Sequence, residues 1–155
     1  MFGGSSQRPV ILAPVEGAVI PMSEVNDPVF SGEILGKGVA IVPSKGRVVA
    51  PADGEVVMVF DTKHAVSVKT PEGAELIIHI GLDTVNLKGE HYTAHVKAGD
   101  HVKAGDLMVE FDIEKIKAAG YDVVTPIVIC NTPEFPDMVC HTGMQVKELD
   151  QIIEL

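Results

Sequence analysis

Short runs of β-branched and aliphatic residues recur along the chain, and each run is bounded by glycine, proline, asparagine or aspartate. Runs of this length with turn-forming residues between them predict strands. The expected strands are residues 10–13, 17–21, 38–42, 46–50, 54–60, 65–69, 75–80, 101–102, 106–111, 125–130, 138–140 and 146–149. Only residues 113–119 predict a helix, with Asp112 as its N-cap and Gly120 as its stop. The pattern predicts an all-β fold, an antiparallel β-sandwich or barrel-sandwich with at most short helical turns.

Two of these runs, separated by the turn-forming segment 70–73, predict a hairpin with His64 beside one strand and His79 in the other. A two-residue loop would set the two histidines directly opposite each other, and a four-residue loop would make them diagonal neighbours on one face. A three-residue loop with a bulge would place them on opposite faces. Two of the three registers therefore predict a histidine pair.

Paired imidazoles suit phosphoryl transfer. A neutral imidazole, with a pKa of about 6.5, is a nitrogen nucleophile near pH 7, and a hydrogen bond to its other nitrogen fixes the tautomer. The second histidine could donate to the phosphoryl oxygens, Thr62 could orient it, and Gly81 would allow close approach of backbone or partner. The alternative is that both histidines are structural residues of the core, and the pattern alone leaves this open.

Composition and length fit one globular domain. The chain has 155 residues, of which 46% are hydrophobic. We expect a single domain over residues 9–155 after a disordered lead-in of residues 1–8. Because no apolar run is long enough for a membrane span and the first residues lack a signal-peptide core, we expect a cytoplasmic location. Cys130 and Cys140 fit neither a disulfide framework nor a four-ligand metal site.

The formal net charge is −10, which argues against nucleic acid and anionic membranes as partners and favours a protein with a basic docking face. Four further histidines lie in polar segments where we expect them at the surface: His91, His95, His101 and His141. Residues 96–100 and 102–106 repeat the sequence VKAGD, which predicts two successive turns that present lysine and aspartate to solvent.

Several motifs together resemble a known family. From about Val10 to Val146, the chain resembles the glucose-type IIA domain (enzyme IIA) of the bacterial phosphoenolpyruvate-dependent sugar phosphotransferase system. The motifs that carry the resemblance are residues 13–17 (APVEG), 27–30 (DPVF), 36–41 (GKGVAI), 51–54 (PADG), 62–66 (TKHAV), 75–85 (ELIIHIGLDTV), 87–90 (LKGE) and 125–128 (TPIV).

The resemblance assigns different roles to the two histidines. It implies that His79 accepts a phosphoryl group on Nε2 as a transient phosphohistidine, that His64 hydrogen-bonds that group, and that Thr62 holds the His64 ring. The implied donor is the phosphohistidine of the carrier protein HPr, and the implied acceptor is a cysteine of the sugar-specific IIB domain. The chain would thus be a phosphotransferase component that needs no cofactor and no metal, and the fold that the family implies is again an antiparallel β-sandwich.

The resemblance also implies a partner-binding rim around the pair. Five apolar residues would form it, and Asp83 would lie at its edge: Val29, Phe30, Phe60, Ile77 and Val85. A dry rim would keep water from the phosphoryl group. Core packing is the alternative for Phe60 and Ile77, and Phe30 is expected in a loop. Two departures are visible, because residues 91–95 carry two histidines in place of a Gly-Phe pattern and the tail after Cys140 matches loosely.

Three other functions are alternatives for a chain with this sequence. A zinc endopeptidase of the LytM type would need a His-x-His motif that the chain lacks, and a lipoyl or biotin carrier would need a lysine at an exposed hairpin tip, where Lys63 is not expected. A regulatory module that binds permeases or metabolic enzymes when unphosphorylated would use the same face. In such a complex the pair could share Zn²⁺ with a partner's carboxylate, although two nitrogens alone leave the metal shell incomplete.

Overall fold

A large antiparallel sheet organises the fold in the computed structural model, which describes residues 8–155. Every strand pair in the sheet is antiparallel, and β11 lies between β3 and β7. The eight strands are, in spatial order, β13 (Gln145–Val146), β2 (Gly17–Pro21), β3 (Lys37–Pro43), β11 (Thr125–Ile129), β7 (Glu75–His79), β6 (Ala65–Lys69), β5 (Gly54–Val59) and β9 (His101–Val102).

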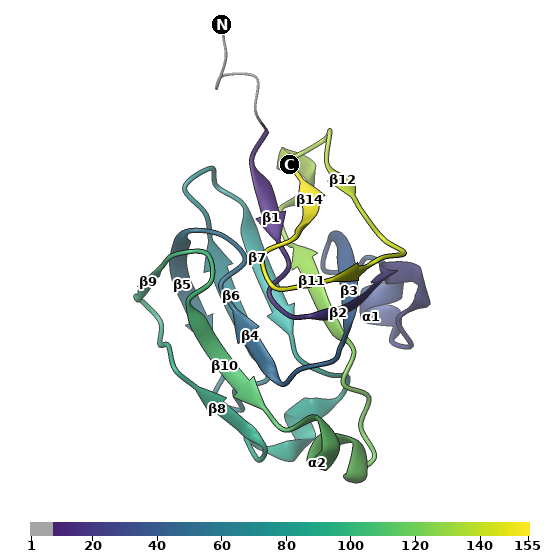
Figure 1. Cartoon of the computed structure of the whole chain (residues 1–155). Coiled ribbons are helices and arrows are strands. Elements are labelled where there is room, and N and C mark those ends of the chain that lie inside the picture. The colour runs from purple at the N-terminus through teal and green to yellow at the C-terminus, as the bar shows by residue number, and fades with distance from the viewer. Residues whose placement is uncertain (1–7) are drawn as a thin grey trace, which may run out of the picture.

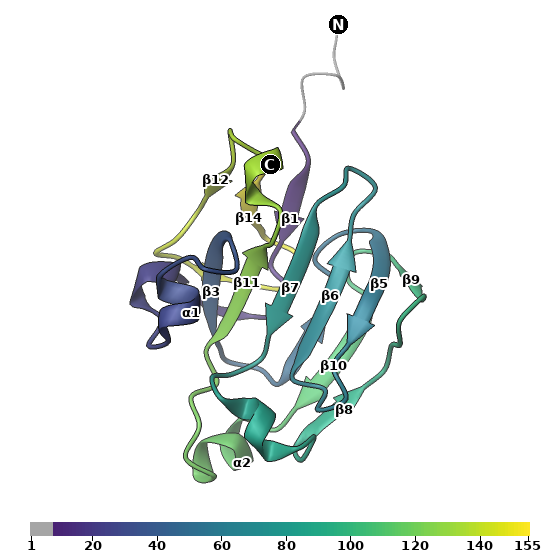
Figure 2. The ribbon, with the colours of Figure 1, turned by 180° about the vertical axis from the view of Figure 1, so that it is seen from behind.

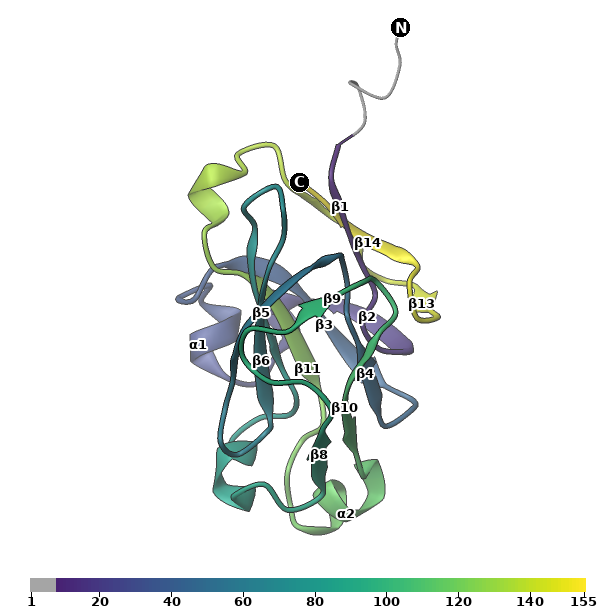
Figure 3. The same cartoon turned by 90° about the vertical axis from the view of Figure 1, so that its left-hand side faces the viewer.

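Two small antiparallel sheets complete the sandwich (Figure 1). One contains β4 (Arg47–Val49), β10 (Leu107–Phe111) and β8 (Tyr92–Ala94), and Figure 3 shows it as a second layer beside the large sheet. The other contains β1 (Val10–Leu12), β14 (Gln151–Glu154) and β12 (Val139–Cys140), near the C-terminus. The prediction of an antiparallel β-sandwich is confirmed.

The main core lies where the sheets face each other. Leu76 and Ile78 of β7 and Ile127 and Ile129 of β11 point into it, and all four are fully buried. Because β11 is also covered on its other face, all five of its residues are buried, which explains its uninterrupted apolar sequence.

A second, smaller apolar cluster covers that other face. It includes Met22, Val25 and Phe30 together with Val124 and Val128. The short helix α1 (Pro28–Ser31) supplies Phe30 and begins at Asp27, whose carboxylate accepts a hydrogen bond of 3.0 Å from the Val29 backbone N–H. Figure 2 shows α1 beside the β3 and β11 side of the sheet. Phe30 therefore lies in a helix and not in the expected loop.

The expected helix is present as α2 (Ile113–Ala118). The carboxylate of Asp112 accepts a hydrogen bond of 3.1 Å from the Lys115 backbone N–H, and Gly120 follows with φ of +95°. No helix between residues 8 and 155 has the length and apolar composition that crossing a membrane requires. The described residues 8–155 also contain three short 3-10 turns, η2 (Met22–Glu24), η3 (Thr84–Leu87) and η4 (Thr132–Glu134).

Most expected strands are present within one or two residues of their predicted bounds. The prediction of a strand at 146–149 is wrong, because β13 ends at Val146. The chain then turns, and the backbone N–H of Lys147 donates a hydrogen bond of 2.8 Å to the carboxylate of Asp150. Two strands were not predicted at all, β8 and β14. Of the expected lead-in, residues 1–7 lie outside the described part, whereas the guanidinium of Arg8 donates to the main-chain oxygens of Leu155 and Asp137.

The repeated VKAGD segments form the two predicted turns. In each turn, the backbone N–H of the lysine, Lys97 or Lys103, donates a hydrogen bond of 2.9 Å to the carboxylate of the aspartate three residues later. The turn from Lys147 to Asp150 has the same bond but carries Leu149, at φ of +75°, where the other two have glycine.

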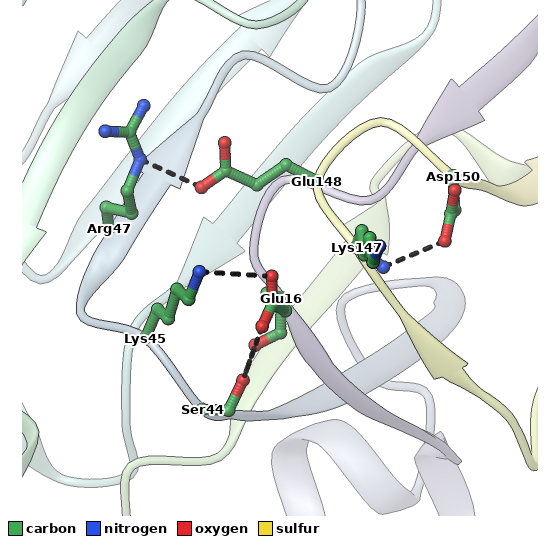
Figure 4. Close-up of polar contacts among 7 residues, drawn as sticks. All are labelled: Glu16, Ser44, Lys45, Arg47, Lys147, Glu148 and Asp150. Carbon is green, nitrogen blue, oxygen red and sulfur yellow. Dashed lines mark hydrogen bonds and ion pairs between the residues drawn. The ribbon is translucent and has the colours of Figure 1, made fainter.

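Two surface ion pairs lie around the C-terminal turn (Figure 4). The guanidinium of Arg47 donates a hydrogen bond of 2.8 Å to the carboxylate of Glu148, and the Lys45 ammonium lies 3.6 Å from the carboxylate of Glu16. All four side chains are partly exposed to solvent, so the contribution of these ion pairs to stability is small.

Candidate functional site

The rings of His64 and His79 lie against each other. Their centroids are 4.7 Å apart and their planes cross at 84°, an edge-to-face arrangement. His79 is the last residue of β7, and His64 immediately precedes β6. The predicted histidine pair therefore exists.

The hairpin register that was expected to create the pair is wrong. His79 lies opposite Ala65, and Thr70 and Ala74 close a three-residue loop through a hydrogen bond of 2.9 Å. Regular alternation in this register would place the two histidines on opposite faces. His64 escapes the alternation because it lies outside the strand, after Lys63 with φ of +62°. The turn between β5 and β6 creates the pair, and the hairpin loop does not.

His79 uses its Nδ1 in a hydrogen bond with the carbonyl oxygen of Gly81, 2.7 Å away. A carbonyl only accepts, so Nδ1 carries the proton and Nε2 keeps its lone pair. Gly81 has φ of +92°, and a Cβ there would lie 2.5 Å from Cγ2 of Thr84. Only glycine fits this position, so the carbonyl that sets the His79 tautomer depends on it.

The ring of His64 is held by a hydrogen bond with Thr62. Its Nδ1 lies 2.6 Å from Oγ1 of Thr62, and its ring is 3% exposed. When the Thr62 hydroxyl donates to Nδ1, the proton of the neutral ring is on Nε2, which then becomes a hydrogen-bond donor. Thr62 and His64 thus have the contact that the sequence predicted.

Both histidines are neutral near pH 7. Burial, with a smaller effect of the neighbouring His79, lowers the pKa of His64 from 6.5 to about 4. Burial also lowers the pKa of His79, opposed by the Gly81 carbonyl and by the carboxylates of Asp27 and Asp83. Each ring therefore has one protonated and one free nitrogen under physiological conditions.

Two phenylalanines contact the pair. The Phe30 ring centroid lies 5.0 Å from that of His79, and the Phe60 centroid lies 5.5 Å from that of His64. Phe30 is only 4% exposed, so it packs in the core as well as against the histidine, whereas Phe60 is 37% exposed at the surface. These rings surround the pair with apolar atoms and lower the local polarity.

The other expected rim residues lie on the elements that flank the pair. Ile77 is half-buried and shares a face of β7 with His79, because residues two apart in a strand point the same way. Val29, in α1, is 40% exposed, and Val85, in η3, is 48% exposed. Asp83 is exposed, with φ of +58°, just before η3.

Asp27 is a site residue that the sequence reasoning missed. In the sequence it stands only as part of the motif at residues 27–30, yet its carboxylate is near enough to raise the pKa of His79 while it caps α1. The DPV sequence, an acidic residue followed by proline, was a signal for a helix start. Its nearness to His79, however, depends on tertiary packing of α1 over β11.

The arrangement fits nucleophilic transfer to one nitrogen. Nε2 of His79 is neutral and has no hydrogen-bond partner among residues 8–155, the neighbouring ring can donate, and the walls are apolar. Within residues 8–155, no three side chains of His, Cys, Asp or Glu gather closely enough to hold a metal ion. The pair alone would supply two of the four ligands that Zn²⁺ prefers.

Comparison with known proteins identifies relatives of this chain. Residues 9–135 match the family model described as phosphoenolpyruvate-dependent sugar phosphotransferase system, EIIA 1. The glucose-specific EIIA component of Halalkalibacterium halodurans is 54% identical over 127 residues, which cover 82% of this chain and 73% of that protein. The beta-glucoside-specific EIIBCA component of Bacillus subtilis is 52% identical over 128 residues, which cover 83% of this chain but only 21% of that longer protein.

A solved structure agrees with these sequence relatives. The glucose permease IIA from Mycoplasma capricolum superimposes with a TM-score of 0.90 at 34% identity, and the match covers 99% of both chains. The matched family, the fold and the sequence identities agree with one another, and the chain belongs to the glucose-type EIIA family of the phosphoenolpyruvate-dependent sugar phosphotransferase system.

Proposed function

We propose that this chain carries a phosphoryl group on His79, received from phosphorylated HPr and passed to a cysteine of a IIB domain during sugar uptake. The observation that carries the proposal is the free Nε2 of a neutral His79 held beside His64. Membership of the EIIA family supports the phosphocarrier role.

The transfer step uses the lone pair of His79. Nε2 attacks the phosphorus, a nitrogen–phosphorus bond forms, and the bond from phosphorus to the donor's ring nitrogen breaks, with its electron pair leaving on the donor ring. The positive charge that develops on the His79 ring is stabilised through Nδ1–H by the Gly81 carbonyl and, at longer range, by Asp27 and Asp83. The IIB cysteine thiolate then attacks the phosphorus, a sulfur–phosphorus bond forms, and the nitrogen–phosphorus bond breaks with its electron pair returning to Nε2, which leaves His79 neutral.

His64 donates a hydrogen bond to the phosphoryl group and does not itself become phosphorylated. With Thr62 donating to Nδ1, its Nε2–H is available for a phosphoryl oxygen, and the depressed pKa keeps the ring neutral. A donor that is fixed before the reaction costs no reorganisation when charge develops on the oxygens.

The surface around the pair suits protein partners. Val29, Phe60 and Val85 expose apolar area beside the acidic Asp83, and the chain carries a net charge of −10. Such a face favours a partner with an apolar centre and basic groups. The name EIIBCA of the Bacillus subtilis relative describes IIB, IIC and IIA parts in one chain, which supports a IIB domain as the acceptor.

Replacing each histidine separates the two roles. We expect His79→Ala to abolish labelling by phosphorylated HPr, because it removes the nucleophile. We expect His64→Ala to accept the label but pass it slowly to IIB, because it removes the donor to the phosphoryl oxygens. His101→Ala, at an exposed strand position, is the matched control and should behave as the wild type. Label retained on His79→Ala, or normal onward transfer by His64→Ala, would contradict the assignment.

The same exposed apolar face also supports a second function, binding of permeases or metabolic enzymes by the unphosphorylated chain. A phosphoryl group on His79 would place negative charge at the centre of this face and weaken such a contact. Retention of one target equally by both forms would argue against this second function and leave the phosphocarrier role intact.

A further inference from the structure

The carbonyl oxygen of Ile80, next to His79 in sequence, accepts two side-chain hydrogen bonds. The hydroxyl of Tyr92 donates to it over 2.8 Å, and the hydroxyl of Thr84 donates to it over 2.8 Å. Both donors are buried, with Tyr92 at 5% and Thr84 at 0% exposure. A backbone oxygen in this loop is therefore held by two hydroxyls, one of them from a different sheet.

The Ile80 carbonyl belongs to the peptide that leads into Gly81. The N–H of that peptide, which belongs to Gly81, donates a hydrogen bond of 3.1 Å to the Val124 carbonyl. The next N–H, of Leu82, donates a hydrogen bond of 3.0 Å to the backbone carbonyl of Asp122. With Gly81 fixed at φ of +92°, these bonds set the direction of the Gly81 carbonyl. That carbonyl is the acceptor for Nδ1–H of His79, at 2.7 Å.

We propose that the Tyr92 hydroxyl is a positioning group for His79. By holding the Ile80–Gly81 peptide, it orients the Gly81 carbonyl, which keeps the proton of His79 on Nδ1 and leaves Nε2 free to react. The inference rests on the proposed function, since it concerns the reactivity of the same histidine. Tyr92 touches no reacting atom and acts only through this peptide.

The placement of Tyr92 fits such a role. It lies in β8 of the small sheet, where its ring stacks on that of Phe111, its partner in the ladder, at 6.4 Å between centroids. Burial raises the pKa of Tyr92 to about 12, so the hydroxyl keeps its proton and remains a donor at any pH at which the chain works. A ring anchored in one sheet thus fixes a loop that leaves the other.

Tyr92→Phe removes the hydroxyl and keeps the ring, and Tyr121→Phe is the matched control. Tyr121 is the only other tyrosine and is half-buried outside the site. The first measurement is the ¹⁵N shifts of the His79 ring nitrogens across pH in the unphosphorylated full chain. The second is the rate of labelling by phosphorylated HPr, and urea unfolding confirms that each variant is folded.

In the wild type and in Tyr121→Phe we expect Nδ1 protonated and Nε2 unprotonated. In Tyr92→Phe we expect the two shifts to move toward each other as the second tautomer becomes populated. The pKa of His79 should fall, because the Gly81 bond favours the charged ring while His64, Asp27 and Asp83 are unchanged. The labelling rate should fall about three- to tenfold, the range that one hydrogen bond of ordinary strength covers.

Two results distinguish failure of this inference from failure of the proposed function. If His79 takes the phosphoryl group in the wild type but Tyr92→Phe leaves both its ring shifts and its labelling rate unchanged, Tyr92 only packs the core and the positioning role is overturned. If Tyr92→Phe shifts the tautomer while the wild type is not labelled by HPr, the positioning role stands and the proposed phosphocarrier function fails.

Discussion

Single residues decide which nitrogen of each histidine is free. The Gly81 carbonyl fixes Nδ1 of His79 and the Thr62 hydroxyl fixes Nδ1 of His64, so the Nε2 atoms are the ones left to react or donate. Neither contact is with a charged group. Because burial lowers the pKa of both rings, they stay neutral near pH 7, and the His79 nucleophile is available without a separate general base.

Gly73 and Gly81 allow a matched test of this arrangement, because both have φ of +92°. A Cβ on Gly73 would meet no atom within 4 Å, whereas one on Gly81 would lie 2.5 Å from the Thr84 side chain and 3.0 Å from the Asp122 carbonyl. We expect Gly73→Ala to lower the unfolding free energy by about 1 kcal/mol, the cost of the left-handed conformation. We expect Gly81→Ala to cost about 3 kcal/mol, because the backbone must also shift.

Urea unfolding of the two variants measures these costs, and HPr-dependent labelling shows their effect on the site. Gly73→Ala should be labelled at the wild-type rate, and Gly81→Ala should be labelled slowly. Equal unfolding free energies for the two variants would show that the space around Gly81 is not restrictive.

Among the elements, the turn between β5 and β6 has the largest effect on the site. Its closing bonds run from Phe60 N–H to the Ala65 carbonyl, 3.0 Å, and from Lys63 N–H to the Phe60 carbonyl, 2.8 Å. Lys63, at φ of +62°, rotates the chain so that His64 leaves the strand alternation and faces His79. The pair thus depends on a backbone conformation and not on strand register.

Substitution of Lys63 tests this dependence. Glycine adopts positive φ without strain, so Lys63→Gly should retain onward transfer to IIB. A β-branched residue is strongly disfavoured there, so Lys63→Val should displace His64 and slow onward transfer as His64→Ala does. Both variants lose the same charge, and therefore equal transfer rates would contradict the role of the turn.

The sequence is sufficient to predict most of the strands, because their apolar runs and turn residues are local signals. The hairpin loop was misjudged by one residue, because Thr70–Gly73 fits several turn types and the closing contacts of Ala74 with Thr70 appear only in three dimensions. The helix α1 has four residues and shows no helical period, so its sequence predicts a loop.

The strand β14 and the tail around it could not be predicted for a different reason. Ile152 and Ile153 are adjacent and both fully buried, so the strand shows no alternation of apolar and polar residues. The segment 146–149 looked like a strand, but Leu149 adopts positive φ in a turn that glycine forms twice elsewhere in the chain. Such a position carries no local sequence signal.

For the whole molecule, burial of the histidines makes stability depend on pH. Unfolded His64 takes up a proton below pH 6.5, whereas in the folded chain its pKa is about 4. Between these values the unfolded state binds more protons, so stability is complete above pH 6.5 and is lost as the pH falls toward 4. The lowered pKa of His79 acts in the same direction.

Urea unfolding between pH 7.5 and 4.5 tests this dependence. From the His64 shift we expect a loss of up to about 3 kcal/mol in the wild type over this range, apart from the contribution of carboxylates. His64→Gln should show a smaller loss, and His101→Gln, at an exposed position, should match the wild type. An equal pH dependence for His64→Gln and the wild type would show that His64 is not buried in its neutral form.

A single domain over residues 9–155 stays a prediction, because the family model ends at residue 135 and some relatives are several times longer. At one end of the large sheet, β7, α1 and the β5–β6 turn meet at the two histidines. The central claim is that this meeting point makes one nitrogen, Nε2 of His79, the phosphoryl acceptor.

Mapping of the phosphate tests that claim most directly. The chain is incubated with phosphoenolpyruvate, enzyme I and HPr, and the acid-labile phosphate is located by ³¹P and ¹⁵N spectroscopy of histidine-labelled protein. We predict a single phosphate on Nε2 of His79, with Nδ1 still protonated toward Gly81. Phosphate on His64, on Nδ1 of His79 or on any other residue would contradict the account.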